Sequence, residues 1–277
     1  MIPAAFDYVR ASSVDEAVAL LAEHGDEAKL LAGGHSLLPL MRLRLAVPGV
    51  LVDVGRIGDL SGISSEDGQV RIGALARHQD VATSEVVRSA VPLLATVAGQ
   101  IGDPQVRHRG TLGGAIAHGD PASDLPAALL ALRATLVAQG PGGTREIPVD
   151  EFFTGFLETA LAPDEMLTGV RVPATGAAGW AFEKFNRRAQ DWAIVGVAAV
   201  LGNGAGGSPG VGLVNMGATP LRAAAVEDAL RAGASAADAA ARADEGTEPT
   251  ADLNASPDFR RHLARVLVRR ALETASA

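Results

Sequence analysis

The chain contains no cysteine among its 277 residues. A chain without thiols cannot form a disulfide, a thiolate zinc site, a cysteine-ligated iron–sulfur cluster or a cysteine nucleophile. Its fold must therefore be stabilised by a hydrophobic core, and any redox cofactor must be held without sulfur. A hydrophobic share of 48%, against 20% charged residues, is sufficient for such a core and excludes global disorder.

Charge and residue order exclude further classes of function. The chain has 24 Lys and Arg against 32 Asp and Glu, and the net charge of −8 argues against a nucleic-acid-binding surface. The six histidines are scattered and do not form an H-E-x-x-H zinc site, so we expect no metal. No apolar run approaches the roughly 20 residues of a membrane span, and the opening MIPAAFDYVR does not resemble a signal peptide. We therefore expect a cytoplasmic protein.

Three regions differ in their hydrophobic pattern, and we interpret residues 1–57, 58–173 and 174–277 as separate domains. The first contains a capping box at residues 13–16, which predicts a helix that ends near His24. The strands expected in the first two regions are 28–31, 50–54, 70–73, 134–138 and 166–172, with further helices at 86–101 and 125–132.

The third region is predicted to form a small antiparallel sheet followed by helices. Its expected strands are 180–186, 192–201 and 211–217, and its helices are 223–243, interrupted by Gly233, and 258–274. Arg260 and four other arginines are expected on the surface of the last helix. Residues 202–207 match the letters G-x-G-x-x-G, but a strand rather than a helix follows them. A hairpin loop is therefore favoured over a dinucleotide-binding motif.

Two pairs of adjacent glycines are the clearest candidates for a binding site. One lies in residues 32–36 (AGGHS), after a predicted strand, and the other in residues 111–114 (TLGG), within a long loop-like segment at 102–124. Paired glycines allow successive backbone N–H groups to point into one concavity, which is the geometry of an anion nest. Either pair alone is compatible with an ordinary turn. Two nests in one chain suit the two phosphoryl groups of a pyrophosphate and indicate a dinucleotide cofactor.

Asp124 lies about ten residues beyond the second glycine pair, directly before Leu125 and Pro126. Its carboxylate could cap the helix expected from Leu125, or it could bind a polar group of a ligand. The residues alone leave both interpretations open. They also give no candidate for a catalytic acid, base or nucleophile.

The two glycine motifs together resemble the paired FAD-binding signature of the flavin-carrying medium subunits of the molybdenum hydroxylases, the carbon monoxide dehydrogenase and xanthine dehydrogenase type. The resemblance covers essentially the whole chain. It extends to the segments 2–8, 103–107, 163–167 and 183–188. One difference is Ala115, where many members of the family have Asn, so that only backbone contacts are expected at this position.

The resemblance implies an α+β fold: an FAD-binding fold of two α/β subdomains, of the PCMH type, plus a C-terminal domain of a three-stranded antiparallel sheet with helices. It also implies that FAD is bound non-covalently. The pyrophosphate would lie at the two glycine loops, Asp124 would bind cofactor hydroxyls, Lys184 would lie near the flavin, and Trp192 would stack on the ring unless it is a core strand residue. The full set of implied cofactor-binding residues is Leu31, Ala32, Gly33, Gly34, His35, Ser36, Leu37, Ile101, Thr111, Leu112, Gly113, Gly114, Ala115, Ser123, Asp124, Leu167, Lys184 and Trp192.

The resemblance further implies a flavoprotein subunit that passes electrons from a partner's [2Fe–2S] cluster to an external acceptor. Because the chain has no cysteine, the cluster would lie on a small subunit and substrate oxidation on a large molybdopterin subunit, in a dimer of heterotrimers. Two alternatives stay open: a self-contained FAD-dependent oxidoreductase that acts directly on a small substrate, and an assembly subunit whose flavin site has decayed. The sequence names neither the substrate nor the final electron acceptor.

Overall fold

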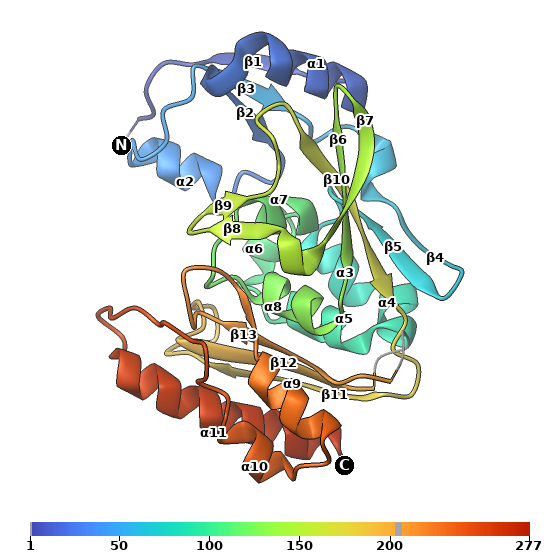
Figure 1. Cartoon of the computed structure of the whole chain (residues 1–277). Coiled ribbons are helices and arrows are strands. Elements are labelled where there is room, and N and C mark those ends of the chain that lie inside the picture. The colour runs from blue at the N-terminus through green and yellow to red at the C-terminus, as the bar shows by residue number, and fades with distance from the viewer. Residues whose placement is uncertain (1, 203–206) are drawn as a thin grey trace.

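The computed structural model describes residues 2–202 and 207–277. Within these ranges the strands form three main sheets and one short hairpin. The three sheets follow one another from the N-terminal to the C-terminal end of the molecule, with the short helices of the middle region between the second and third sheets (Figure 1). In the described ranges, no helix combines the length and apolar character that a membrane span requires.

The first sheet is parallel, with β1 (Asp7–Arg10) and β2 (Ala28–Leu31) on either side of β3 (Val50–Asp53). Helix α1 (Val14–His24) covers it with three buried apolar side chains, and α2 (Leu37–Arg42) follows β2. The predicted helix and both predicted strands are present, and β1 is an additional strand. The capping box differs in one partner: Ser13 accepts a hydrogen bond from the backbone N–H of Glu16, whereas the Glu16 carboxylate accepts from the N–H of Ser12 at 2.7 Å.

The second sheet is antiparallel and mixes strands from distant parts of the sequence, in the order β4-β5-β10-β6-β7. Its strands are β4 (Ile63–Glu66), β5 (Gln69–Gly73), β6 (Thr135–Gly140), β7 (Gly143–Pro148) and β10 (Met166–Pro173), and β8 (Phe153–Gly155) and β9 (Glu158–Thr159) form the separate hairpin. The helices of this region are α3 (His78–Thr83), α4 (Glu85–Ala90), α5 (Pro92–Gly99), α6 (Pro104–Arg107), α7 (Leu112–Ala117) and α8 (Asp124–Ala131), and short 3-10 helices lie at Gly25–Glu27, Gly58–Ser61 and Val149–Glu151.

Two expectations for this region are corrected. The single helix predicted at 86–101 is two helices, because Pro92 has no N–H to continue the first and instead begins the second. The segment 102–124 is not one long loop, since it contains α6 and α7, each capped by a side chain, Asp103 and Thr111 respectively. Helices of four and six residues are too short to leave a periodic signal in the sequence.

The third sheet is antiparallel and contains β11 (Gly179–Phe185), β12 (Val195–Leu201), β13 (Gly210–Val214) and β14 (Leu221–Arg222). The three predicted strands are present, and β14 extends the sheet to four strands. A two-residue strand carries no alternation that a sequence pattern could reveal. The predicted hairpin loop at 202–207 lies partly outside the described residues, but the strands on either side of it, β12 and β13, pair antiparallel.

Helices cover both faces of the third sheet. Helix α8 approaches β13 so closely that a Cβ on Gly212 would lie 2.0 Å from the carbonyl oxygen of Ala127, which explains the glycine. Helix α11 (Pro257–Ala275) packs on the other side with α9 (Ala224–Arg231) and α10 (Ala236–Ala240) (Figure 1). Arg260 of α11 does not lie on the surface as expected: it is 1% exposed and pairs with Asp252 at 2.8 Å.

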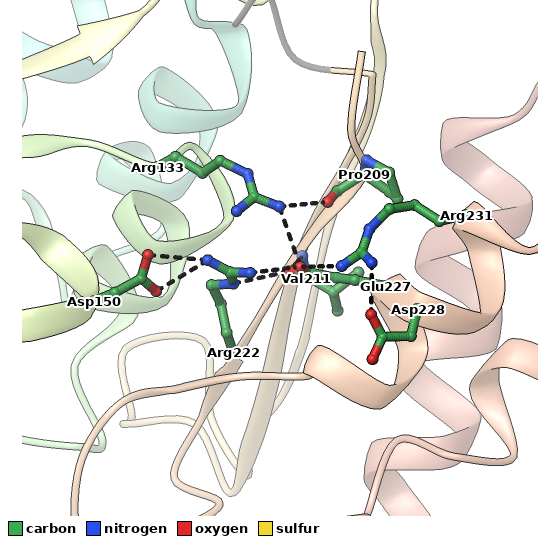
Figure 2. Close-up of polar contacts among 8 residues, drawn as sticks. All are labelled: Arg133, Asp150, Pro209, Val211, Arg222, Glu227, Asp228 and Arg231. Carbon is green, nitrogen blue, oxygen red and sulfur yellow. Dashed lines mark hydrogen bonds and ion pairs between the residues drawn. The ribbon is translucent and has the colours of Figure 1, made fainter. Parts of the chain in front are cut away.

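A buried carboxylate joins the middle region to the C-terminal region. Glu227 of α9 is fully buried and accepts hydrogen bonds from Arg222 at 2.8 Å, from Arg133 at 3.2 Å and from the N–H of Val211 at 3.0 Å. Figure 2 shows these groups converging on the carboxylate. Arg222 also pairs with Asp150 at 2.9 Å, so residues of both regions share one network of charges. This network, together with α8, holds the third sheet against the middle region.

Candidate functional site

The first glycine loop presents a row of free backbone amides. It connects β2 to α2, and Gly34 has a φ of +76°, a conformation that glycine adopts without strain. Within the described part of the chain, the N–H groups of residues 33–37 donate no hydrogen bond to another residue. Consecutive unpaired amides in a loop of this kind form an anion-binding concavity. The free amides of residues 33–37 are therefore compatible with the anion nest predicted for the first glycine pair.

The second glycine loop differs from the expected nest, because its amides are already used. The N–H of Leu112 donates to the carbonyl of Ala76 and the N–H of Gly113 to that of Ala74, both at 2.8 Å, while the N–H of Gly114 donates to Thr111 Oγ1. The cause is the segment just before α3, which lies alongside the loop and pairs with it. This long-range pairing could not be read from the local sequence. The N–H groups of Leu112, Gly113 and Gly114 are therefore not available to a ligand, and the second loop contributes to the site by packing.

The two loops lie against each other. A Cβ on Gly33 would lie 2.2 Å from the carbonyl oxygen of Arg109 and 3.0 Å from Cα of Gly110, so only glycine fits here. A Cβ on Gly113 would lie 2.5 Å from Cβ of Ala74. The structure therefore brings together segments that are about 80 residues apart in sequence. Gly33 and Gly113 permit this close packing because they have no Cβ.

Asp124 and Lys184, both predicted to contact the cofactor, form a buried ion pair. Asp124 Oδ2 lies 2.6 Å from Lys184 Nζ, and the two side chains are 6% and 5% exposed. Asp124 is the first residue of α8 and Ser123 its N-cap, so the carboxylate is not the helix cap. Burial raises the pKa of Asp124, and Lys184 opposes this rise. The second carboxylate oxygen, Oδ1, is buried and has no hydrogen-bond partner among the described residues, which leaves it available to a donor group of a ligand.

Comparisons with known proteins assign the chain to a family. Residues 4–175 match the model of the FAD binding domain in molybdopterin dehydrogenase, and residues 180–275 match the CO dehydrogenase flavoprotein C-terminal domain. The chain belongs to this FAD-binding family of molybdopterin dehydrogenases. These matches confirm the family resemblance, the α+β fold class and FAD as the cofactor. The chain is thus the flavoprotein component of an oxidoreductase.

Two curated relatives are similar to this flavoprotein over nearly their whole length. It is 44% identical to the carbon monoxide dehydrogenase medium chain of Hydrogenophaga pseudoflava, with 100% of this chain and 99% of the relative covered. It is 38% identical to the 6-hydroxypseudooxynicotine dehydrogenase complex subunit alpha of Paenarthrobacter nicotinovorans, over 99% and 96% of the two chains. A solved structure of the Hydrogenophaga pseudoflava carbon monoxide dehydrogenase superposes with a TM-score of 0.96 at 45% identity, covering 100% of this chain and 99% of that one.

The apolar residues predicted at the flavoprotein's site fall into two groups. Leu112 is completely buried and Leu167 is 5% exposed, and both belong to the hydrophobic core, whereas Ile101 is partly exposed at its edge. Trp192 is not a core strand residue, since it lies before β12 and is 60% exposed. With Phe156 it borders a pocket of about 490 Å³ that also includes residues 120–122, just ahead of Asp124.

His78 is a candidate residue that the sequence did not reveal. It begins α3, it is 4% exposed, and its backbone N–H donates to the carbonyl of Gly110 in the second loop at 3.0 Å. Its ring atom Nδ1 has no hydrogen-bond partner in the described structure. A histidine at a helix start has no distinguishing pattern, so only the fold identifies it. No group of metal-ligating side chains occurs among the described residues.

We expect the stability of the flavoprotein to decrease between pH 6.5 and pH 4 in a way that depends on His78. Burial lowers the pKa of His78 from its ordinary 6.5 to about 4, and the charges of His35 and Arg107 add to this effect. The unfolded chain therefore binds a proton on His78 at a higher pH than the folded chain does. The contribution of His78 to the free energy of unfolding therefore falls by about 3 kcal/mol as the pH falls from 6.5 to 4.

The measurement is the free energy of unfolding by urea as a function of pH, for the wild type and for His78→Gln. The wild type should lose free energy of unfolding relative to His78→Gln as the pH falls from 6.5 to 4, because glutamine has no group that takes up a proton in this range. Parallel pH profiles would contradict the buried neutral state of His78.

Proposed function

We propose that the chain holds FAD non-covalently and forms the electron-transfer link between a partner's [2Fe–2S] cluster and an external acceptor. When bound, FAD supplies the capacity to exchange electrons singly or in pairs. The first glycine loop would bind the diphosphate through the free amides of residues 33–37. The second loop would pack against the first loop and hold it in position. The row of free amides is the observation that carries this proposal.

The residues of this chain fit FAD at two separate places. The first loop offers donors for an anion, and the unpartnered Asp124 Oδ1 offers an acceptor for a hydroxyl group. A molecule with a diphosphate and several hydroxyls matches both. Lys184 would hold the Asp124 carboxylate in place and oppose the rise in its pKa that burial causes, which favours Oδ1 as a hydrogen-bond acceptor. The exposed indole of Trp192 would cover an apolar ring, and Ile101 and Leu167 would line the wall.

The absence of cysteine from this chain indicates that an iron–sulfur cluster must be held by a partner subunit. Relatives are named as the medium chain or as a subunit of a dehydrogenase complex. We propose a small [2Fe–2S] subunit and a large molybdopterin subunit as partners. The dimer of heterotrimers, the cytoplasmic location and the domain limits 1–57, 58–173 and 174–277 stay predictions.

FAD is expected to be released when the purified protein is denatured in acid. No cysteine can form a thioether to the flavin, and His35, which lies in the first loop, is expected to contribute loop geometry without a covalent bond. The measurement is the absorption spectrum of the supernatant and of the pellet. A pellet that stays yellow would contradict non-covalent binding, and a purified complex without flavin bands would favour a decayed site.

The isolated chain is expected not to be reduced by the organic or gaseous substrate of the native complex. In the reconstituted complex, addition of the same substrate should bleach the flavin absorption, because electrons then reach it through the partner subunits. Turnover by the isolated chain at the rate of the native preparation would favour the self-contained oxidoreductase instead. Dithionite reduction of the isolated chain is the control that its flavin is competent.

A further inference from the structure

Arg260 is a buried cation whose hydrogen bonds all leave its own helix. The side chain is 1% exposed, and a buried guanidinium costs free energy unless its donors find partners. Nη1 donates to the carbonyl of Ile194, Nε donates to the carbonyl of Thr250 at 3.1 Å, and Nη2 lies 2.8 Å from Asp252 Oδ2. The guanidinium therefore connects two segments of the chain that are separate from each other in sequence.

The three acceptor residues border one pocket. This is the pocket of about 490 Å³ beside Trp192, and its walls include Ile194, Thr250 and Asp252. Ile194 follows Trp192 by two residues, whereas the other two acceptors lie in the segment that precedes α11. Arg260 is enclosed in the fold and does not itself border the pocket in the described structure. It therefore joins two walls of the pocket without occupying the space for a ligand.

Asn215 connects one of these walls to the middle region. Its Nδ2 donates to the carbonyl of Ala193 at 3.1 Å, and its backbone N–H donates to the carbonyl of Pro121 at 2.8 Å. Ala193 and Pro121 also border the pocket, as does Asn215 itself. All three walls are thus held by hydrogen bonds to backbone carbonyls, and Arg260 is the member of this frame that lies outside the pocket.

The carboxylate of Asp252 balances the charge of Arg260. Desolvation raises the pKa of Asp252, but hydrogen bonds from Asn254, Ala255 and Arg260 outweigh this rise and lower the pKa from 3.8 to about 2. Asp252 is therefore ionised at neutral pH. Its side chain is 44% exposed, so water can still hydrate the carboxylate when the guanidinium is removed.

The directions of the bonds explain why this position holds an arginine. A guanidinium presents its N–H donors in a fixed planar fork, whereas the ammonium of a lysine is a point charge on a flexible stem. An apolar side chain of similar length would fill the space without burying a charge, but it would connect nothing. The fork can bond three acceptors on two segments at once and so fix the distance between them.

We propose that Arg260 is a positioning residue for this pocket, which holds segments 192–194 and 250–252 in place and thereby keeps Trp192 at the ring end of the bound dinucleotide. This inference rests on the proposed function, because it assigns the pocket to the flavin end of FAD. The hydrogen bonds of Arg260 in the described structure include none to either glycine loop. Loss of the guanidinium should therefore weaken FAD and leave ADP, which has the diphosphate but no flavin, unaffected.

The test compares Arg260→Lys, which keeps the charge, with Arg260→Met, which keeps only the length of the side chain. Arg265→Met is the matched control, since Arg265 also lies on α11 but pairs with Asp244 at 2.7 Å, away from the pocket. Dissociation constants of the full-length chain are measured for FAD by flavin fluorescence and for ADP by calorimetry. Thermal melting without ligand reports on the fold. Arg260→Met is also made in a Trp192→Ala chain.

We expect Arg260→Met to bind FAD at least about fivefold more weakly and ADP within about twofold of the wild type, with Arg260→Lys between the wild type and Arg260→Met for FAD. Arg265→Met should change neither affinity. In the Trp192→Ala chain, Arg260→Met should add less than about twofold, because the indole that it positions is already absent.

Equal weakening of FAD and ADP would overturn the proposal, as would the full fivefold effect of Arg260→Met in the Trp192→Ala chain. Wild-type affinity for FAD in a folded Arg260→Met chain would overturn it as well. If Arg260→Met does not fold, Arg260→Lys decides by the same comparison of FAD with ADP, because it lacks the fork of donors. A wild-type chain without affinity for FAD, or for ADP, would instead refute the proposed function, which places the diphosphate at the first glycine loop.

Discussion

Substitution of Gly33 by valine is expected to abolish FAD binding. A side chain here would meet the carbonyl oxygen of Arg109, because even a Cβ would lie 2.2 Å from it. The two loops would have to separate, and the amides of residues 33–37 would no longer share one concavity. Hydrogen bonds from such donors to a charged group are worth about 1.5–3 kcal/mol each, so the loss of two weakens binding by at least about 100-fold.

The measurement is the flavin content of the purified variant, followed by its FAD dissociation constant. Gly62→Val is a matched control, since a Cβ at Gly62 would have no atom within 4 Å and its φ of −68° suits valine. Circular dichroism and thermal melting show whether Gly33→Val has folded, and Gly33→Ala repeats the test with a smaller group. Wild-type flavin content in a folded Gly33 variant would refute the diphosphate assignment. Gly113→Val is less informative, because it would disturb packing against Ala74 directly.

Substitution of Lys184 by methionine is expected to destabilise the chain by about 3–5 kcal/mol. The change removes an ammonium that lies 2.6 Å from Asp124 and leaves that carboxylate buried without its partner. Methionine keeps most of the length and volume of lysine, so the loss reflects charge more than packing. FAD binding should weaken in the same variant, because an unpaired Asp124 will be protonated or displaced.

The free energy of unfolding is measured by urea denaturation. Arg269→Met is the matched control, since Arg269 pairs with Glu273 on the exposed surface of α11, where the expected change is about 0–1 kcal/mol. The double variant Asp124→Asn with Lys184→Met should recover much of the lost stability, because no buried charge is left unpaired. A Lys184→Met variant as stable as Arg269→Met would show that the pair does not act as a buried ion pair. Asp124→Ala is also expected to lower the free energy of unfolding, since it leaves the buried ammonium of Lys184 without its partner.

Several element positions could be predicted because their signals are local. The capping residue Ser13 and the apolar spacing after it predict α1, and short strand-like runs predict β11, β12 and β13. The helices α6 and α7 were not predictable, because four to six residues contain too few turns to show a period. Gly33 could be identified as a loop residue, but not as a point of contact with Arg109.

The sequence by itself determined the absence of a sulfur-held cofactor, the family of the chain and the presence of two glycine loops, since each depends on residue identity and order along the chain. The tertiary structure alone decided how those loops work. It placed the segment before α3 beside the second loop, which used the amides of Leu112 and Gly113, and left those of residues 33–37 free. It also joined Asp124 to Lys184 and buried His78 beside Gly110. Hydrogen-bond partners and burial depend on segments that meet only in the folded chain, and no local pattern encodes which segments meet.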